Sequence, residues 1–168
     1  MDEHRVGLKP VLRRVWALRG QRPILPVQQR YEWLYVYGFV QPATGRNFWL
    51  LLPSVSISLF STALLHFAEF VRSTTRAHID LVLDRAGWHT SPRVSWPQAI
   101  RPDFLPPYSP ELQPAEHLWH LCDVPLLNRH FPSLDALQAV LAQRCQSLQT
   151  QLSSVRSATL FPWWSDFV

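Results

Sequence analysis

The sequence has 168 residues, 47% of them hydrophobic, with 16 basic and 12 acidic side chains. A chain of this length and composition buries a real core in one domain, which excludes a disordered or fibrous polypeptide. Its two cysteines, Cys122 and Cys145, form neither a CxxC pair nor a disulfide framework, so a reducing, cytoplasmic location is expected.

The positive charge gathers near the start of the sequence. Residues 1–30 carry seven basic and two acidic side chains, and 15 of the 16 basic residues in the chain are Arg. The planar guanidinium of Arg matches phosphate oxygens, so this patch suits a nucleic-acid backbone. A solvated surface without a partner fits the same pattern.

The first expected elements are strands. Residues 11–17 read as a strand, and residues 21–28, with two prolines, as a loop. Between 31 and 39 every second residue is aromatic, which is more typical of a sheet face packed on a helix than of a base-stacking surface. Residues 41–47 supply turn chemistry, and 48–52 return as the antiparallel partner. The alternating aromatic residues are Tyr31, Trp33, Tyr35, Tyr37 and Phe39.

A stretch without charged residues runs from 48 to 68, and its 21 positions are enough for a membrane span. Pro53 and several hydroxyl residues interrupt it, which favours a strand, a turn and an amphipathic helix instead. Ser56 or Ser58 is expected to cap that helix, which ends near Arg72. No membrane partner is expected.

The second half of the chain alternates strands with helices. Residues 79–83 form an apolar run typical of a buried strand, which ends at Asp84. A loop with a short helix follows, then a brief strand at 103–105, and helices over about 114–122 and 133–149. This order predicts an α/β fold whose mixed central sheet has antiparallel hairpin strands on one side, parallel strands on the other, and flanking helices.

The proline-rich stretch from Leu105 to Trp119 is the most specific signal in the sequence. Pro114 fits the first position of a helix, Gln113 would be its cap, and Glu116 falls in the first turn. A carboxylate there offsets the positive end of the helix, or it projects from a rigid support toward a site.

Two further carboxylates are candidates to meet Glu116. Asp84 sits at the carboxyl end of a buried strand, where open α/β sheets form ligand sites, and Asp2 would join it from a neighbouring strand. Each pair of carboxylates at about 4 Å repels by on the order of 4 kcal/mol at an effective dielectric constant of about 20. Hard cations such as Mg²⁺ or Mn²⁺ offset this repulsion, and two of them can stabilise the attacking and leaving oxygens at a phosphorus centre.

The motifs around these acids are DEHRVGL, which contains Asp2, HIDLVLDRAGWHTS, which contains Asp84, and FLPPYSPELQPAEHLW, which contains Glu116. Together they resemble the catalytic domain of bacterial insertion-sequence transposases of the mariner-like superfamily, the DDE transposases. The resemblance spans nearly the whole chain. It implies a ribonuclease H-like fold in which these three residues are the catalytic acids and bind two Mg²⁺ or Mn²⁺ ions.

The resemblance also implies partners and a location. In the family, the domain hydrolyses DNA at the transposon end, and the freed 3′-hydroxyl then attacks target DNA. Expected partners are therefore DNA and either a second copy of the chain or an intact transposase, at the nucleoid in the bacterial cytoplasm. Candidate DNA contacts are Arg5, Lys9, Arg13, Arg14 and His89, the last of which also fits a packed or solvated loop histidine.

The sequence departs from the family pattern in three places. A Gln-Pro pair replaces the usual Asn-Pro ahead of Glu116, and Arg85 stands where an Asn often follows the second aspartate. Family members carry helix-turn-helix domains before a complete first strand, whereas only Met1 precedes Asp2. Residues 1–168 are therefore expected to be a catalytic domain without the helix-turn-helix region and without part of the first strand.

Three other interpretations remain open. One is an inactive remnant that only binds DNA or an intact partner. Another is a glycoside hydrolase that uses Asp84 and Glu116 without a metal. A third is a zinc site at His117, His120 and Cys122, although Cys122 lies off the helix face that the two histidines share.

Overall fold

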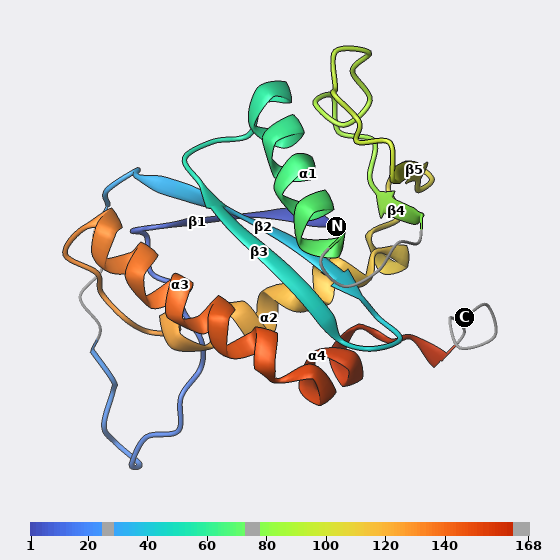
Figure 1. Cartoon of the computed structure of the whole chain (residues 1–168). Helices are drawn as coiled ribbons and strands as arrows, with labels where there is room; N and C mark the ends of the chain where they lie inside the picture. Colours follow the sequence, from blue (N-terminus) through green and yellow to red (C-terminus); the bar gives the residue numbers. More distant parts are fainter. Residues whose placement is uncertain (25–28, 73–77, 163–168) are drawn as a thin grey trace.

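The computed structural model describes residues 1–24, 29–72 and 78–162. Strands cross the middle of the molecule and helices cover both of their faces (Figure 1). The α/β class and the combination of antiparallel and parallel strands expected from the sequence are confirmed. The α-helices are α1 (Ile57–Arg72), α2 (Trp119–Cys122), α3 (Leu134–Thr150) and α4 (Leu152–Thr159), and the 3-10 helices are η1 (Pro110–Leu112), η2 (Pro114–Leu118) and η3 (Val124–Leu126).

The strands form two groups that meet at β1. In one group β1, β2 and β3 pair antiparallel in that order, and in the other β4 and β5 pair in parallel. The backbone nitrogen of Met1 donates to the carbonyl of Val82 at 2.7 Å, so β1 lies between β2 and β4. Because α1 links β3 to β4 as a crossover, β4 runs in the direction of β3 and β1. The strands are β1 (Asp2–Gly7), β2 (Trp33–Gln41), β3 (Arg46–Leu52), β4 (Ile79–Leu83) and β5 (Ile100–Phe104).

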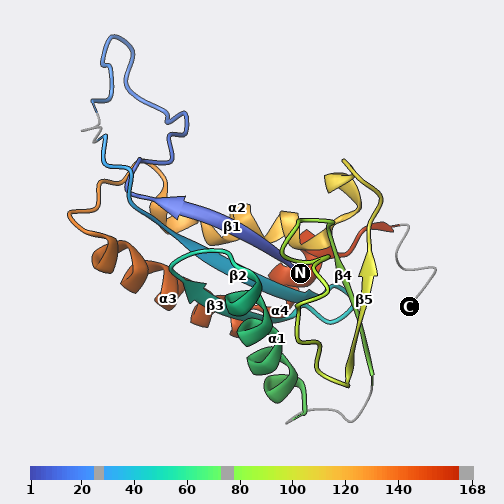
Figure 2. The ribbon, with the colours of Figure 1, turned by 90° about the horizontal axis from the view of Figure 1, so that it is seen from above.

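Two apolar cores lie on opposite faces of the antiparallel strands, between the strands and the helices drawn in Figures 1 and 2. On one face Phe39 of β2 stacks on Phe67 of α1 with ring centroids 4.3 Å apart, and Tyr37 is fully buried beside it. This confirms the expected packing on a helix for the later residues of the aromatic row, whereas Tyr31, outside the strand, is 78% exposed and Trp33 is 42% exposed. On the other face, side chains of η2, α2, α3 and α4 cover β1 and β2, with Trp119 among them.

The helix after the hairpin follows its sequence signals. Ser56 accepts a hydrogen bond from the Leu59 nitrogen at 3.1 Å, which is the expected cap, and α1 ends at Arg72 as expected. In the described residues, 1–24, 29–72 and 78–162, none of the helices combines the length and the hydropathy that a membrane crossing requires.

The strand expected at 11–17 is wrong. Val11 makes one isolated bridge to Leu127, and the residues after it have no strand structure. Trp16 is wholly exposed and Leu18 is 73% exposed, because no neighbouring strand or helix covers this loop. Its apolar residues resemble a strand in the sequence alone, and Figure 1 shows the loop projecting away from the sheet.

Two expectations in the second half also need correction. The segment between Asp84 and Ile100 contains turns but no helix, and Pro92 and Pro97 each remove a backbone donor there. The helix expected from Pro114 starts as the 3-10 helix η2 and becomes α-helical only at Trp119. The helix α4 was not expected.

Candidate functional site

The three acids come from three elements that meet at one end of β1. Asp2 opens β1, Asp84 directly follows β4, and Glu116 lies in η2. Because Met1 is bonded to Val82 and the two strands run in one direction, Asp2 and Asp84 lie at neighbouring positions of adjacent strands. Asp2 therefore joins Asp84 from a neighbouring strand, as expected from the sequence.

The pKa of Glu116 responds to the other two acids. Burial raises the pKa of Glu116, and the negative charges of Asp2 and Asp84 raise it further, while His4 lowers it. A carboxylate responds in this way only to charges within its own neighbourhood, since solvent screens those farther away. The fold therefore brings Glu116 within range of the charges on Asp2 and Asp84.

Asp84 is held by two hydrogen bonds to the same oxygen. Its Oδ1 accepts from the backbone nitrogen of Ala86 at 3.0 Å and lies 2.6 Å from Nδ1 of His89. The hydrogen bond with His89 is the main reason that the pKa of Asp84 falls below its usual value. The carboxylate is 58% exposed, so it keeps its charge and remains accessible.

His89 sits between two carboxylates. Its Nε2 lies 2.9 Å from Oε1 of Glu3, whose side chain is only 4% exposed. Burial lowers the pKa of His89, but the hydrogen bonds to Asp84 and Glu3 outweigh burial and raise it to about 9. The ring is therefore protonated at neutral pH and donates to both acids.

The structure corrects the expectation that His89 contacts DNA. Its side chain has no exposed surface and packs against the rings of Phe60 and Trp88. Sequence reasoning also overlooked Glu3, its partner. The alternation along β1 places Glu3 on the face of the sheet opposite Asp2, but Arg5 on the same face is exposed, so no local signal marked Glu3 as buried.

Trp119 contributes a hydrogen bond as well as packing. It is buried as expected, and its Nε1 donates to Oδ2 of Asp2 at 2.9 Å. The indole also stacks on His4, with ring centroids 5.0 Å apart. A buried indole needs a partner for its N–H, and here that partner is a candidate catalytic carboxylate.

The donor set of the cluster suits a hard divalent cation. Asp2, Asp84 and Glu116 offer only carboxylate oxygens, the ligands that Mg²⁺ and Mn²⁺ prefer. The hydrogen bonds of Trp119 and His89 engage one oxygen of each aspartate, Oδ2 of Asp2 and Oδ1 of Asp84. Within the described part of the chain, however, no three His, Cys, Asp or Glu side chains already stand close enough to enclose one ion.

The remaining basic candidates lie on the surface beside β1. Arg5 is exposed and its guanidinium lies 5.3 Å from the centre of the Trp33 ring. Lys9 and Arg14 are exposed on the loop that follows β1. Arg13 is exposed as well, and its backbone is fixed by hydrogen bonds to and from the Asn128 side chain.

The residues of the alternative zinc site point in different directions. Cys122 is fully buried, and a hydrogen bond with Cys145 together with burial raises the pKa of its thiol far above its usual range. His117 and His120 are both exposed. A zinc site would need the Cys122 thiolate on the same surface as the histidines, which this arrangement does not provide.

Comparison with known proteins places the chain among relatives. The family model described as DDE superfamily endonuclease matches residues 1–138. The protein y4pE/y4sA of Sinorhizobium fredii is 36% identical over 133 residues, which are 78% of this chain and 96% of that protein. The residues that match the family model run from β1 into α3 and so include all three acids.

Solved structures of Mos1 transposase have a similar fold. The pre-cleavage Mos1 transpososome matches with a TM-score of 0.62 at 14% identity, covering 95% of this chain and 55% of that one. The Mos1 paired-end complex with the left transposon end matches with a TM-score of 0.59 at 15% identity, over 94% and 54%. The chain thus spans about half the length of these transposase chains. At this identity the likeness shows the fold, and it confirms the expected ribonuclease H-like architecture.

Proposed function

Because the chain belongs to the DDE superfamily endonucleases, we propose that it is a transposase catalytic domain that cleaves DNA strands and transfers the freed end by metal-dependent phosphoryl transfer. One observation carries the proposal. Asp2 and Asp84 lie at neighbouring positions of adjacent strands, and Glu116 of η2 lies near enough that, besides burial, their charges raise its pKa. Such a cluster of carboxylates needs cations or protons to offset its repulsion.

Asp2, Asp84 and Glu116 would hold two Mg²⁺ or Mn²⁺ ions, which supply stabilisation of charge at the attacking and leaving oxygens of the phosphodiester. The protein's own contribution is to orient the acids. His89 holds one oxygen of Asp84, and Trp119 holds one oxygen of Asp2. These contacts fix the carboxylate rotamers before substrate arrives, the usual role of groups behind metal ligands.

We further propose that DNA is the substrate and that the surface beside β1 contacts its phosphates. Arg5, Lys9, Arg13 and Arg14 are all exposed there, and such contacts position a duplex without reading its sequence. The Mos1 relatives include a paired-end complex with a transposon end and a paired-end complex with Mn. Transposon ends, target DNA and a second copy of the chain or an intact transposase are the partners proposed here, within a bacterial insertion sequence.

A second candidate is a protein that binds DNA without cutting it. The observation in its favour is that, over the described residues, the acids do not yet stand close enough to enclose an ion. Such a protein would bind DNA through its exposed arginines and pair with an active transposase. Salt-sensitive DNA binding without cleavage is its signature.

The test is a nicking and strand-transfer assay on DNA with Mg²⁺ or Mn²⁺. Asp84→Ala and Glu116→Ala should each abolish cleavage. Asp80→Ala is the matched control, because Asp80 is 60% exposed and paired with Arg101 at the far end of β4. Cleavage that survives Asp84→Ala contradicts the proposal, and DNA binding without any cleavage favours the second candidate. Hydrolysis of glycosides without a metal would instead favour the carboxylate-pair hydrolase.

A further inference from the structure

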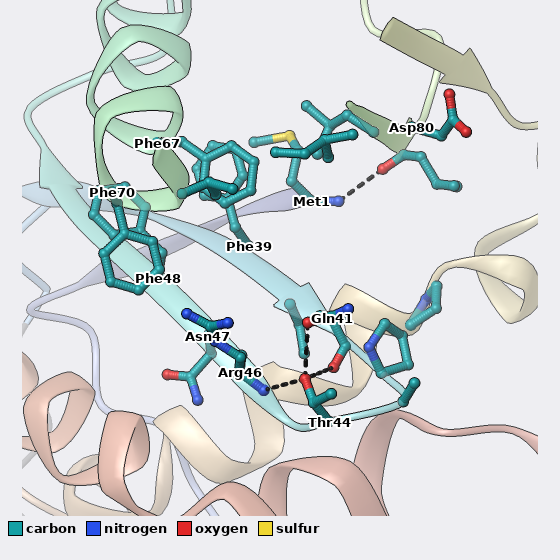
Figure 3. Close-up of a pocket in the computed structure, with 18 of the residues that line it drawn as sticks. Met1, Phe39, Gln41, Thr44, Arg46, Asn47, Phe48, Phe67, Phe70 and Asp80 are labelled. Atoms are coloured by element: carbon teal, nitrogen blue, oxygen red, sulfur yellow. Dashed lines mark hydrogen bonds between the residues drawn. The ribbon is translucent and has the colours of Figure 1, made fainter. Parts of the chain in front are cut away.

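The segment that carries Glu116 has a buried and an exposed side. Gln113 and Pro114, at its start, are buried and line the cavity shown in Figure 3. Leu118 and Trp119 are buried in the core beside β1 and β2. The exposed side forms a ridge along η2 and α2 that begins at Glu116.

Two histidines follow the acid on this ridge. His117 and His120 are exposed, as Glu116 is, and Glu116 and His120 lie four positions apart, which places them on one side of the helical segment. The rise of about 1.5–2.0 Å per residue in such helices separates these two positions by roughly 6–8 Å along the axis. Neighbouring phosphates of one DNA strand have a comparable spacing. The ridge therefore presents its side chains at intervals that suit a nucleic-acid backbone.

Arg13 extends the ridge from a distant part of the chain. The loop after β1 returns to the end of η3, where Val11 forms a bridge with Leu127. The Asn128 side chain then clamps the backbone of Arg13, because its Oδ1 accepts from the Arg13 nitrogen at 2.8 Å and its Nδ2 donates to the Arg13 carbonyl at 3.0 Å. This clamp fixes the point at which the exposed Arg13 side chain leaves the loop.

The three basic side chains act on one another. Partial burial lowers the pKa of His120, the positive charges of His117 and Arg13 lower it further, and Asp123 raises it. Asp123 is itself engaged by Nε2 of His4 at 3.1 Å. Because like charges at close range repel, an anion bound along the ridge is stabilised by all three basic groups.

The layout of the ridge favours a nucleic-acid strand over a small anion. An inorganic phosphate ion has the same chemistry as a DNA phosphate, but it would occupy a single point. The basic groups instead extend over η2, α2 and a loop, and they begin directly beside one of the three acids. A strand that leaves the acids in this direction meets each of them in turn.

We propose that His117, His120 and Arg13 bind successive phosphates of the DNA strand whose scissile bond lies at the three acids. This inference rests on the proposed function, since it takes the acids as the place of cleavage. From Glu116 the strand follows η2 and α2 past the two histidines and reaches Arg13 on the loop after β1. Imidazole and guanidinium N–H groups donate to phosphate oxygens whatever the base, so these contacts position the strand without reading its sequence.

The test varies the charge at position 120. Affinity for a fluorescent DNA duplex is measured by anisotropy in EDTA, so that no divalent ion takes part and no strand is cut. His120→Ala removes the donor and should weaken binding by about three- to tenfold, as the loss of one hydrogen bond does. His120→Arg makes the charge permanent and should strengthen binding. Because His120 is exposed, neither change should lower the melting temperature.

The matched controls are His66→Ala and His66→Arg. His66 lies on α1, across the sheet from α2, and its side chain is 56% exposed. His66→Arg gives the protein the same added charge as His120→Arg but away from the ridge. Neither His66 variant should change the affinity for DNA.

A second measurement locates the contact on the DNA. A methylphosphonate, which removes the charge of one phosphate, is placed at successive positions on each side of the bond that the native protein cuts. One position should weaken binding by the native protein but have no further effect on His120→Ala. That position should lie within a few nucleotides of the cleaved bond, because His120 lies one helical turn from Glu116.

Affinity that rises from Ala to His to Arg at position 120, with no response at position 66 and one methylphosphonate without effect on His120→Ala, supports the proposal. Equal strengthening by His120→Arg and His66→Arg would show that only net charge matters and would overturn it. Inorganic phosphate that shifts the NMR signals of both ridge histidines, while His120→Ala leaves the affinity for DNA unchanged, would assign the ridge to a free anion and overturn it too.

The two levels of the argument fail separately. If the native protein cuts DNA and His120→Ala binds DNA as tightly as the native protein, the path along the ridge is wrong and the proposed function stands. If the native protein neither binds nor cuts DNA, the proposed function is wrong and the path falls with it.

Discussion

Nδ1 of His89 lies 2.6 Å from Oδ1 of Asp84, and Nε2 of the same ring lies 2.9 Å from Oε1 of Glu3. The imidazolium thus joins the start of β1 to the end of β4, the two strands that carry Asp2 and Asp84. Its charge stabilises one exposed and one buried carboxylate together. A residue of the loop after Asp84 therefore determines how that acid is presented.

Replacement of His89 by Ala should destabilise the protein strongly. It leaves the Glu3 carboxylate, which is 4% exposed, without its cationic partner. Removal of one partner from a buried ion pair costs about 3–5 kcal/mol, which urea unfolding followed by Trp fluorescence would measure. Adding Glu3→Gln to His89→Ala should restore part of the loss.

The matched control is His66→Ala. His66 pairs with Glu69 at 3.6 Å, but its side chain is 56% exposed, so the change should stay within about 0.5 kcal/mol. Equal losses for the two substitutions would mean that the His89 contacts contribute no more than a surface pair.

The same contacts predict a dependence of stability on pH. The pKa of His89 is about 9 in the folded protein, against an ordinary value of 6.5. The stabilisation that the charged ring contributes is therefore fully present below pH 6.5 and is lost as the pH rises through 9. The difference in free energy of unfolding between the native protein and His89→Gln should shrink over that interval. A difference that stays constant from pH 6 to pH 10 would show that the ring is not charged in the fold.

Gly38 of β2 leaves room for Trp119. A Cβ at position 38 would lie 2.9 Å from Cη2 of Trp119 and 3.2 Å from a methyl group of Leu118. Gly38→Ala should therefore destabilise by about 1–3 kcal/mol, as overpacked cores do, and should disturb the indole that binds Asp2. Gly87→Ala is the control, because a Cβ there meets nothing within 4 Å. Thermal unfolding of the two variants separates the steric clash at position 38 from the effect that replacing any glycine by alanine has on stability.

The exposed arginines should act through phosphate contacts. If Arg13 and Arg14 each neutralise one phosphate, Arg13→Gln and Arg14→Gln should each reduce the slope of log K against log salt by about 1, without a change in sequence preference. Fluorescence anisotropy with duplex DNA measures this slope. Arg101→Gln serves as the control, since Arg101 pairs with Asp80 away from this loop. An unaltered slope for Arg13→Gln and Arg14→Gln would remove the loop from the DNA interface.

The stretch around Glu116 and the strand before Asp84 were predictable because their signals are local. Pro114 marks a helix start, and the apolar run 79–83 marks a buried strand whose end carries an acid. The hairpin and α1 followed from period and capping in the same way. Local rules suffice where one segment alone determines its own structure.

Contacts between distant segments were not predictable. The link from His89 to Glu3 spans 86 positions, and that from Trp119 to Asp2 spans 117. The error at 11–17 has the opposite cause, because that run has strand-forming residues but no neighbouring edge beyond one bridge at Val11. The role of Gln113, which stands where the family usually has Asn, was not predictable either. Its side chain donates to the carbonyl of Met1 instead of capping a helix.

The central claim is that Asp2, Asp84 and Glu116 together bind two divalent ions. Electron paramagnetic resonance of free Mn²⁺ tests it directly, by titration of the ion into the protein alone. We expect about two ions bound per chain at saturation. Glu116→Gln should weaken the binding at least tenfold, whereas Glu111→Gln, an exposed acid in η1, should not. Mn²⁺ binding that is absent in the native protein, or that is unchanged in Glu116→Gln, would contradict the account.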